Sequence, residues 1–519
     1  MTNLTPEQRI LGRENANQAL GITRRDLLKS AAAAPALGAF YFGYKEMGNR
    51  PPVKAAIIGT GDEGCQAMIR SHNRDYLDFI GFCDIRPSQQ VRAVNEFTAH
   101  KDYSPADVKK IKKYDTKEAM LDDPEVEMIV IALPLWLHAP VAIEAMKKGK
   151  HVFTEKLMAH TIPQCKEMCK VARETNKLLA VGHQRHYSVL YDNANYLLQS
   201  GTLGDVLHIR ALWHRNNALQ RIARDKDGNL MYDPTTGEAV FAKDDKGNPI
   251  YTDSWRRIYP KDDLNVNYAQ YGYESLDQLI NWRLYNKTGA GLMAELGSHQ
   301  LDACSIFLGK KHPLAVTGVG GTYFYKDGRE VDDHVFTIFE FPGASEKDRV
   351  VVTYSSINTN SFDGYGEMVM GSKGTMIVNQ EKEILLYKEA GSAAISRATN
   401  ITVETKGKKP ALETSPSTAG PTAATALGGL ATADPSRGYR EELEHFAYCI
   451  RYGDAKDYHN DKEHQPRCKG EVALADAVIA LSSNMAMRQN RRVEFDPAWF
   501  DYKSDKVPNG DTSLARKGG

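Results

Sequence analysis

Residues 293–308 place two acids and a histidine on one side of an expected helix. Glu295, His299 and Asp302 are spaced i, i+4 and i+7, whereas the opposite side is apolar. Histidine titrates near neutral pH, so His299 can take the proton of a hydroxyl group while Glu295 orients its ring. A solvated stripe on an ordinary surface helix has the same pattern. The stripe therefore predicts acid–base chemistry only together with other motifs.

A glycine-rich turn forms the second candidate site. Residues 53–58 are an apolar run that leads into the sequence Gly-Thr-Gly-Asp-Glu-Gly and then into a helical pattern. In such a turn Gly59 closes the bend, Gly61 allows close approach of a pyrophosphate, and Gly64 allows the helix to pack on the strand. The motif predicts a dinucleotide cofactor at the start of this helix.

Asp84 indicates which dinucleotide is bound. It ends the next apolar run, where a carboxylate accepts hydrogen bonds from the ribose diol of NAD and repels the 2′-phosphate of NADP. We therefore expect NAD to bind more tightly than NADP, with Arg86 as the residue that weakens this preference. Asp62 and Glu63 oppose the charge that attracts phosphate to a helix N-terminus, so we expect them to point to solvent.

Further motifs are similar to those of a known enzyme family. They are the Pro134 to His138 segment, Gly149-Lys150-His151-Val152, Glu155-Lys156, the Gly297 to Asp302 segment, and Gly371-Ser372-Lys373-Gly374-Thr375. Together with the glycine-rich turn, they resemble the glucose-fructose oxidoreductase, inositol dehydrogenase and MocA (Gfo/Idh/MocA) family of NAD(P)-dependent oxidoreductases. The resemblance covers nearly everything from residue 53 onward. It implies a nucleotide-binding domain, then an α/β domain whose open antiparallel sheet often mediates homo-oligomers, here a dimer or tetramer.

The resemblance also assigns roles to residues of the site. It implies that the nicotinamide lies near Glu155 and Lys156, with Pro134 and His138 among the residues that bind the cofactor. The substrate is then expected between the nicotinamide and the second domain. In that position Lys156 can polarise a developing alkoxide or share its proton.

The chain departs from the family pattern beside two of these residues. Leu157 replaces a proline that commonly sets the backbone path after the Glu-Lys pair, and Glu295 takes the place of an aspartate. These departures leave open a catalytically inert sugar-binding protein on the same fold. The retention of Lys156 and His299 favours an enzyme.

The residues after the apolar run at 178–182 are candidates for substrate binding. The sequence Gly-His-Gln-Arg-His-Tyr places polar and aromatic side chains at the carboxyl end of an expected strand, where they suit sugar hydroxyls. We predict that Arg185, Tyr187 and Asp302 contact the substrate. His183 and His186 are explained equally well as buried structural histidines.

Two patterns of hydrophobic runs must position these residues. The first runs lie at residues 55–59, 79–84, 128–133, 151–154 and 178–182. They alternate with helical patterns, which predicts a parallel, doubly wound Rossmann-type sheet. Longer alternating runs lie at 206–214, 315–325, 334–341 and 349–355. They predict a C-terminal α+β domain with a large, mainly antiparallel open sheet, so the fold class is α/β. The segment Trp213-His214-Arg215 in this domain has an even chance of facing the cleft.

Turn signals and composition divide the chain into segments. The expected segments are a signal and spacer at 1–50, an NAD-binding domain at 51–182, a substrate and oligomerisation domain at 183–500, and a tail at 501–519. Within the second domain we expect an inserted hairpin arm at 225–253 and a flexible loop at 405–437. Amphipathic helices are expected near 439–452 and 470–489.

Composition narrows the classes of function. The chain has 519 residues, 42% hydrophobic and 25% charged, as expected for two packed domains. Its 66 basic and 66 acidic residues give no net charge that would favour nucleic acid or an anionic membrane. The seven cysteines include no Cys-x-x-Cys pair, so neither a disulfide framework nor a bound metal is expected.

The N-terminal segment has the layout of an export signal. Thr23-Arg24-Arg25-Asp26-Leu27-Leu28-Lys29 precedes a weakly apolar stretch from Ala31 to Phe42, which predicts recognition by the twin-arginine export machinery. Cleavage sites are possible at Ala34-Pro35-Ala36 and Leu37-Gly38-Ala39; alternatively, Tyr41, Phe42 and Tyr44 hold the segment at an interface. We expect a periplasmic or otherwise exported protein, which an uncleaved signal can retain at the membrane.

These observations lead to one function and two alternatives. The leading hypothesis is an exported NAD-dependent oxidoreductase that transfers hydride between nicotinamide and a secondary alcohol of a sugar, polyol or glycoside. One alternative is an NAD-dependent glycosidase that uses transient oxidation and elimination. The other is the inert sugar-binding protein.

Overall fold

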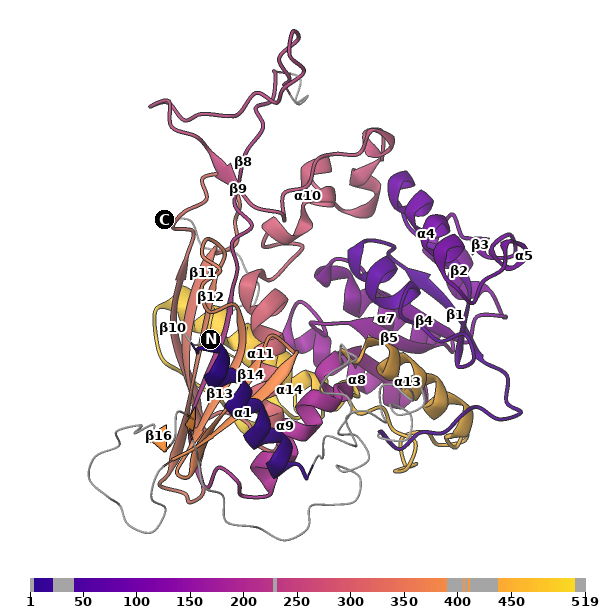
Figure 1. The fold of residues 1–519 in the computed structure, drawn as a ribbon. Helices are drawn as coiled ribbons and strands as arrows, with labels where there is room; N and C mark the ends of the chain where they lie inside the picture. Colours follow the sequence, from indigo (N-terminus) through magenta and orange to yellow (C-terminus); the bar gives the residue numbers. More distant parts are fainter. Residues whose placement is uncertain are drawn as a thin grey trace.

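The computed structural model describes residues 4–21, 42–226, 231–389, 405–406, 409–410 and 437–508. Two large β-sheets lie on opposite sides of a layer of helices (Figure 1). The first sheet is parallel, and the second is mainly antiparallel. The α/β fold class is therefore confirmed.

The first sheet has six parallel strands in the order β3-β2-β1-β4-β5-β6. They are β1 (Val53–Ile58), β2 (Leu77–Cys83), β3 (Lys112–Lys113), β4 (Met128–Ile131), β5 (His151–Glu155) and β6 (Leu179–Gly182). The helices of this part are η1 (Glu63–Ile69), α4 (Pro87–Ala99), α5 (Pro105–Val108), α6 (Lys117–Asp122), η2 (Leu135–Leu137), α7 (His138–Lys147) and α8 (Ile162–Glu174). The strand order reverses between β1 and β4, so a ligand crevice is expected at the carboxyl ends of these strands.

The second sheet has eight strands in the order β15-β14-β13-β7-β12-β11-β10-β18. They are β7 (Val206–His214), β10 (Ala315–Gly321), β11 (His334–Pro342), β12 (Arg349–Ile357), β13 (Tyr365–Gly371), β14 (Gly374–Asn379), β15 (Glu383–Lys388) and β18 (Val493–Glu494). All neighbours are antiparallel except β7 and β12. Buried residues alternate with more exposed ones along β11 and β12, because only one face packs on helices.

Helices α9 (Val189–Gln199), α11 (Ser298–Phe307) and α14 (Gly470–Gln489) pack on the inner face of the second sheet. Helix α13 (Tyr439–Tyr452) packs on the first sheet, so both helices expected near 439–452 and 470–489 are confirmed. Residues 473–487 of α14 are all buried, because α14 contacts α8 as well as β10. It is therefore not amphipathic as expected. Short helices complete this part: η3 (Gln184–Tyr187), η4 (Lys261–Asp263), η5 (Tyr268–Tyr271), α10 (Leu276–Ile280), η6 (Trp282–Leu284), η7 (Met293–Gly297) and η8 (Pro497–Trp499).

Helix α1 (Pro6–Ala19) lies against β15 at the edge of the second sheet (Figure 1). Asn15 Nδ2 donates a hydrogen bond to the Leu386 carbonyl oxygen at 3.0 Å, and Arg13 pairs with Glu383 at 2.6 Å. This helix is part of the folded structure, although the sequence pattern indicated only a signal and spacer. The twin-arginine motif at 23–29 lies outside the described residues.

The aromatic residues after the expected signal pack against the protein itself. The ring of Phe42 lies 5.6 Å from that of Tyr187, and the Tyr44 hydroxyl donates to Glu444 at 2.6 Å. Both side chains are buried, so the interpretation of these two residues as interface anchors is wrong. Among the helices that the structure describes, none is long and apolar enough to cross a membrane.

A long arm extends from the second domain (Figure 1). It begins at β8 (Leu219–Gln220), ends at β9 (Tyr251–Thr252), and contains the segment where a hairpin was expected. The expected loop at 405–437 lies largely outside the described residues, apart from Arg437 and the short strands β16 (Thr405–Lys406) and β17 (Lys409–Pro410).

Candidate active site

The glycine-rich turn after β1 has no space for a side chain at two of its glycines and has open space at the third. Gly59 has a φ of +89°, and a Cβ atom there would lie 2.3 Å from the Ala132 carbonyl oxygen. A Cβ atom on Gly64 would lie 2.1 Å from the Gly59 carbonyl oxygen. Apart from chain neighbours, a Cβ atom on Gly61 would meet nothing within 4 Å. The turn therefore has the shape that a dinucleotide pyrophosphate requires.

A cavity of about 430 Å³ lies beside this turn, at the carboxyl ends of β1, β2 and β4. Gly59, Gly61, Asp84 and Pro134 line it, so the fold brings together four of the predicted cofactor-binding residues. Its size is within the range of small-molecule and cofactor sites. The cavity and the open turn fit NAD.

Asp84 is held in place by the backbone of its neighbours. The Thr60 and Arg86 amides each donate a hydrogen bond of 2.8 Å to its carboxylate. The Arg86 guanidinium is engaged elsewhere, because its Nε donates to the buried carboxylate of Asp263 at 2.9 Å. With Asp84 in the cavity wall and Arg86 bound to Asp263, the site favours the ribose diol of NAD over the phosphorylated ribose of NADP.

Asp62, one of the two acids in the turn, forms ion pairs instead of simply pointing to solvent as expected. Asp62 is paired with Arg92 and with Arg257, each at 2.7 Å. Burial raises the pKa of Asp62, but the hydrogen bond from Arg92 and the charge of Arg257 outweigh it and lower the pKa overall. Two arginines thus neutralise a charge that would otherwise repel a phosphate. Glu63 lines a second cleft beside the first cavity.

Lys156 connects the end of β5 to the second domain. Its Nζ donates to the carbonyl oxygen of Glu295 at 3.0 Å, and its amide donates to the Glu155 carboxylate at 3.2 Å. The Lys156–Leu157 peptide bond is cis. Glu155 is buried, with one carboxylate oxygen that has no hydrogen-bond partner among the described residues.

His138 is placed beneath this segment rather than in the cofactor cavity. Its ring nitrogens lie 2.9 Å from the Leu157 carbonyl oxygen and 2.8 Å from the Leu133 carbonyl oxygen. It is buried and does not line the cavity described above. This arrangement corrects the expectation of direct cofactor binding, because His138 instead fixes the backbone that follows Lys156.

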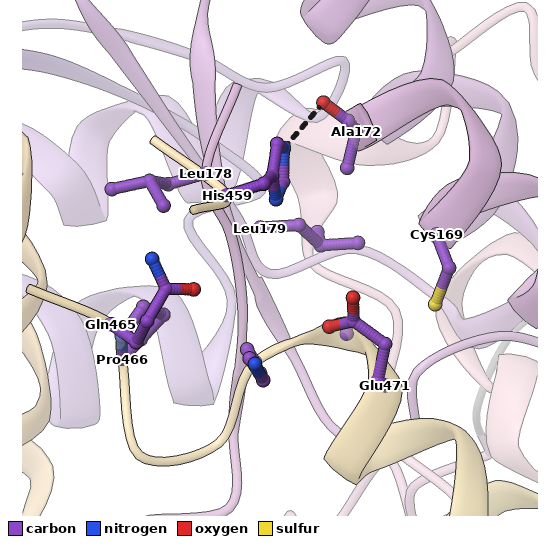
Figure 2. Close-up of a pocket in the computed structure, with 10 residues that line it drawn as sticks. Cys169, Ala172, Leu178, Leu179, His459, Gln465, Pro466 and Glu471 are labelled. Atoms are coloured by element: carbon purple, nitrogen blue, oxygen red, sulfur yellow. Dashed lines mark hydrogen bonds between the residues drawn. The ribbon is translucent and has the colours of Figure 1, made fainter. Parts of the chain in front are cut away.

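The second cleft has a volume of about 550 Å³ and holds the candidate catalytic residues. Lys156, Glu295 and His299 all line it. A third hollow, shown in Figure 2, lies beside His459 and measures only about 10 Å³. That is room for about one water molecule, so the second cleft is the candidate substrate site.

Glu295 does not orient the His299 ring as expected. Its carboxylate accepts a hydrogen bond from Arg283 Nε at 2.9 Å, and its backbone carbonyl holds Lys156. Residues Met293–Gly297 form a π-helical turn, which is wider than an α-helical turn, so side chains four residues apart do not lie directly above one another. Burial raises the pKa of Glu295, but the charges of Arg283 and Lys156 outweigh it and keep the carboxylate ionised.

His299 is held as a neutral imidazole. Burial lowers its pKa well below the ordinary value, and the positive charges of Lys156 and Arg185 act in the same direction. Its Nδ1 has no hydrogen-bond partner among the described residues, and the Trp213 ring lies 5.6 Å away. A neutral ring in the wall of a cleft can accept a proton from a bound hydroxyl group.

Arg185 is buried behind the cleft, which corrects its prediction as a substrate contact. It forms ion pairs with Glu381 at 2.9 Å and with Glu367 at 3.1 Å. Its Nη1 also donates to the carbonyl oxygen of His299. Arg185 therefore positions the helix that carries His299, because a buried guanidinium requires such partners.

Asp302 and Tyr187 also lie in the interior instead of in either cleft. Asp302 is hydrogen-bonded to His186 at 2.9 Å and to Lys310 Nζ at 2.7 Å. The Tyr187 hydroxyl is hydrogen-bonded to His445 at 2.8 Å. Asp302 follows His299 on α11 by three residues, and its carboxylate is directed to His186 and Lys310 instead of the cleft. The prediction that these residues contact substrate is corrected accordingly.

Other residues of the cleft had little or no sequence signal. On β7 and just beyond it, Trp213 and Arg215 line the cleft, whereas His214 between them bonds to Ser355 at 2.8 Å. Strand alternation restricts Trp213 and Arg215 to one side but does not say which. Residues that the sequence did not single out are Arg257, Arg283, Trp255, Arg437 and Tyr439. They come from loops and helix starts far apart in the chain, where no spacing rule applies.

Comparison with known proteins agrees with this geometry. Residues 53–183 match the family model described as "Oxidoreductase family, NAD-binding Rossmann fold", and residues 263–377 match the "GFO/IDH/MocA C-terminal domain". The chain belongs to the Gfo/Idh/MocA oxidoreductase family. Its first domain is therefore an NAD-binding Rossmann domain.

Individual members of the family are distant in sequence. Inositol 2-dehydrogenase of Salmonella typhimurium is 25% identical over 159 residues, 30% of this chain and 44% of the relative. A glycosyl hydrolase family 109 protein of Shewanella baltica is 26% identical over 170 residues, 31% of this chain and 35% of the relative. The chain thus spans less than half the length of these curated relatives.

A solved structure shares the fold over most of its length. The WlbA dehydrogenase of Bordetella pertussis, in complex with NADH and UDP-GlcNAcA, has a TM-score of 0.54 and 15% identity. The match covers 86% of this chain and 98% of that chain. At this identity the likeness is one of fold.

Proposed function

We propose that this Gfo/Idh/MocA protein oxidises a secondary alcohol of a sugar, polyol or glycoside with NAD. The observation that carries the proposal is the shared cleft of Lys156, Glu295 and His299, which adjoins the cavity lined by Gly61 and Asp84. The relative named inositol 2-dehydrogenase supports a polyhydroxylated substrate.

Each of the two catalytic residues has a distinct role. NAD, when bound, supplies a hydride acceptor. His299 accepts the hydroxyl proton, because its ring is neutral and the residue lines the cleft. The Lys156 ammonium stabilises the negative charge that develops on the same oxygen.

Two buried contacts position these side chains. The Glu295 carbonyl fixes the Lys156 ammonium, and Arg185 fixes the backbone carbonyl of His299. Glu295 and His299 both come from the helical segment η7–α11, so this segment sets the geometry of the proton acceptor and of the ammonium. Preorganised groups of this kind need little rearrangement during the reaction.

Substitution of the two catalytic residues tests the proposal. A screen of sugars, polyols and aryl glycosides for NADH formation first identifies a substrate. His299→Ala and Lys156→Ala are then each expected to lower kcat by about 10²-fold or more and to leave NAD affinity nearly unchanged. Glu295→Gln is expected to cost less, because the bond to Lys156 comes from the backbone carbonyl.

His459→Ala is a suitable control. This histidine lies at the small hollow of Figure 2, and its hydrogen bond is to the Ala172 carbonyl oxygen and not to a residue of the cleft. It is expected to keep wild-type turnover. If His299→Ala also keeps wild-type turnover on an identified substrate, the assigned proton acceptor is wrong.

A glycosidase is the second candidate. The glycosyl hydrolase family 109 relative favours it, because that name denotes cleavage of a glycosidic bond. Release of aglycone from an aryl glycoside without accumulation of NADH would identify this activity. Failure to observe either NADH or aglycone, with sugars still bound, would instead support the inert sugar-binding alternative.

A further inference from the structure

Most arginines of the substrate cleft are neutralised by carboxylates of the protein. Four of them form ion pairs: Arg70 with Glu96, Arg257 with Asp62, Arg283 with Glu295, and Arg437 with Glu381. The separations are between 2.6 and 2.9 Å. Each of these arginines therefore already has a carboxylate partner.

Arg215 is the exception. Among the described residues no carboxylate lies within 4.0 Å of its guanidinium group. Its Nε donates to the neutral amide oxygen of Asn358 at 2.8 Å, and its guanidinium carbon lies 4.7 Å from the centre of the Trp255 ring. Its Nη2 is buried and has no hydrogen-bond acceptor in the part of the chain that the structure describes. A buried donor on a charged group is costly unless an acceptor completes it.

Asp253 and Glu295 are the acids whose charges act most strongly on Arg215, and both already pair with other arginines. Asp253 accepts from Arg329 at 2.9 Å, and Glu295 accepts from Arg283 at 2.9 Å. Burial lowers the pKa of Arg215, whereas the pKa of Arg283 beside Glu295 is raised in spite of its burial. The protein therefore compensates the charge of Arg283 but not that of Arg215.

The position of Arg215 connects it to the reacting groups. It follows Trp213 by two residues on the same side of an extended strand, a rise of about 7 Å, and Trp213 lies against the His299 ring. A sugar ring bound beside His299 can thus extend to Arg215. Trp213 and Trp255 both line the cleft.

We propose that Arg215 and Trp255 form a subsite for an anionic sugar, whose carboxylate pairs with the Arg215 guanidinium. The proposal rests on the oxidoreductase function and names its substrate class, a sugar acid. A carboxylate matches the planar fork of a guanidinium and would supply Arg215 with the negatively charged partner that the described residues do not provide. The cleft volume of about 550 Å³ is sufficient for such a ligand.

Matched pairs of neutral and acidic sugars test this subsite. The NAD-loaded protein is titrated by calorimetry and assayed for NADH with glucose and glucuronate, galactose and galacturonate, and glucose 6-phosphate. We expect at least one sugar acid to bind about tenfold or more tightly than its neutral counterpart. Arg215→Gln is expected to weaken that binding by about 10²-fold and to leave the neutral sugar unaffected, while Arg215→Lys retains part of the preference.

Arg210→Gln is the matched control, because Arg210 lies on the same strand but pairs with Asp363 away from the cleft. It is expected to keep the preference for the acid. Equal binding of acidic and neutral sugars, or a preference that survives in Arg215→Gln, overturns the subsite. A preference for glucose 6-phosphate over both uronates would show that the subsite binds a phosphate, and it would overturn the proposal that the substrate is a sugar acid. Arg215-dependent binding of the acid without NADH formation supports the subsite and contradicts the oxidoreductase function instead.

Discussion

The Glu155 carboxyl group is buried at the end of β5, next to Lys156. Burial and the charge of nearby Glu63 raise its pKa from the ordinary value of 4.5 to about 8. Only the Lys156 amide donates to it among the described residues, and its second oxygen has no partner. The folded protein therefore holds a proton on Glu155 at pH values at which the unfolded chain has lost it.

This shift predicts how stability depends on pH. Between pH 4.5 and about 8 the folded state binds more protons than the unfolded state, so the free energy of unfolding falls as pH rises. Glu155→Gln mimics the protonated form and is expected to remove a slope on the order of 1 kcal/mol per pH unit. Urea denaturation of the cofactor-free protein between pH 5 and 8 measures this effect.

The exposed residue Glu346 provides the reference, because Glu346→Gln changes the same chemical group in solvent. It is expected to keep the wild-type slope. A wild-type slope in Glu155→Gln would show that Glu155 is ionised in the folded protein at neutral pH.

Sequence reasoning identified residues of the site when a local pattern determined their position. Gly59, Gly61 and Asp84 were found because a strand, a tight turn and a strand end fix their geometry. Arg185 was assigned to substrate because its type and its place at a strand end suited sugar hydroxyls, whereas Asp302 belonged to the stripe of Glu295 and His299. Glu367 and Glu381, the buried partners of Arg185, and His186, the buried partner of Asp302, lie far away in the chain, so no spacing could indicate that these polar groups were already paired.

At the scale of elements, two glycines of the turn between β1 and η1 serve different purposes: Gly64 is needed for folding, and Gly61 is needed for cofactor binding. A Cβ atom on Gly64 would lie 2.1 Å from a backbone oxygen, whereas one on Gly61 would lie in open space. Gly64→Ala is therefore expected to destabilise the domain by about 1–3 kcal/mol, as overpacking does. Gly61→Ala is expected to leave stability unchanged and to weaken NAD binding by about tenfold or more, because the methyl group occupies the path of the pyrophosphate.

Thermal denaturation and calorimetric titration with NAD measure the two effects separately, and each variant controls for the other. Loss of stability in Gly61→Ala would contradict the open geometry of the turn. Unchanged NAD affinity in that variant would place the pyrophosphate elsewhere.

Whether a whole strand could be predicted from the sequence depended on how deeply it is buried in its sheet. Strands β1, β2, β4, β5 and β6 were recognisable because burial on both faces makes most of their residues apolar. Strand β3 consists of two exposed lysines at a sheet edge and left no such signal. The parallel pairing of β7 with β12 was also not readable, because residues alternate between faces in parallel and antiparallel strands alike.

At the scale of the whole molecule, the site depends on contacts between the two domains. Lys156 reaches Glu295, and Arg86 reaches Asp263, so both the catalytic ammonium and the wall of the cofactor cavity are held across the domain boundary. The N-terminal helix α1 adds a long-range contact of another kind, to β15 of the second sheet, and Leu4 just before this helix packs on the cluster of Leu212, Met368, Ile377 and Leu385. This helix precedes the twin-arginine motif, so it bears directly on the fate of the signal.

We propose that the protein is exported, that export depends on the arginine pair, and that α1 stays in place. The export machinery reads the pair as an address, so exchange of Arg24 and Arg25 for lysine preserves charge but is expected to strand the protein in the cytoplasm. Cleavage near Ala36 would remove α1 and expose the apolar cluster that includes Ile377 and Leu385, which favours aggregation. Cell fractionation with intact mass measurement tests both points. A double variant that still reaches the periplasm contradicts the twin-arginine address, and a periplasmic form that lacks the first 36 residues contradicts retention of α1.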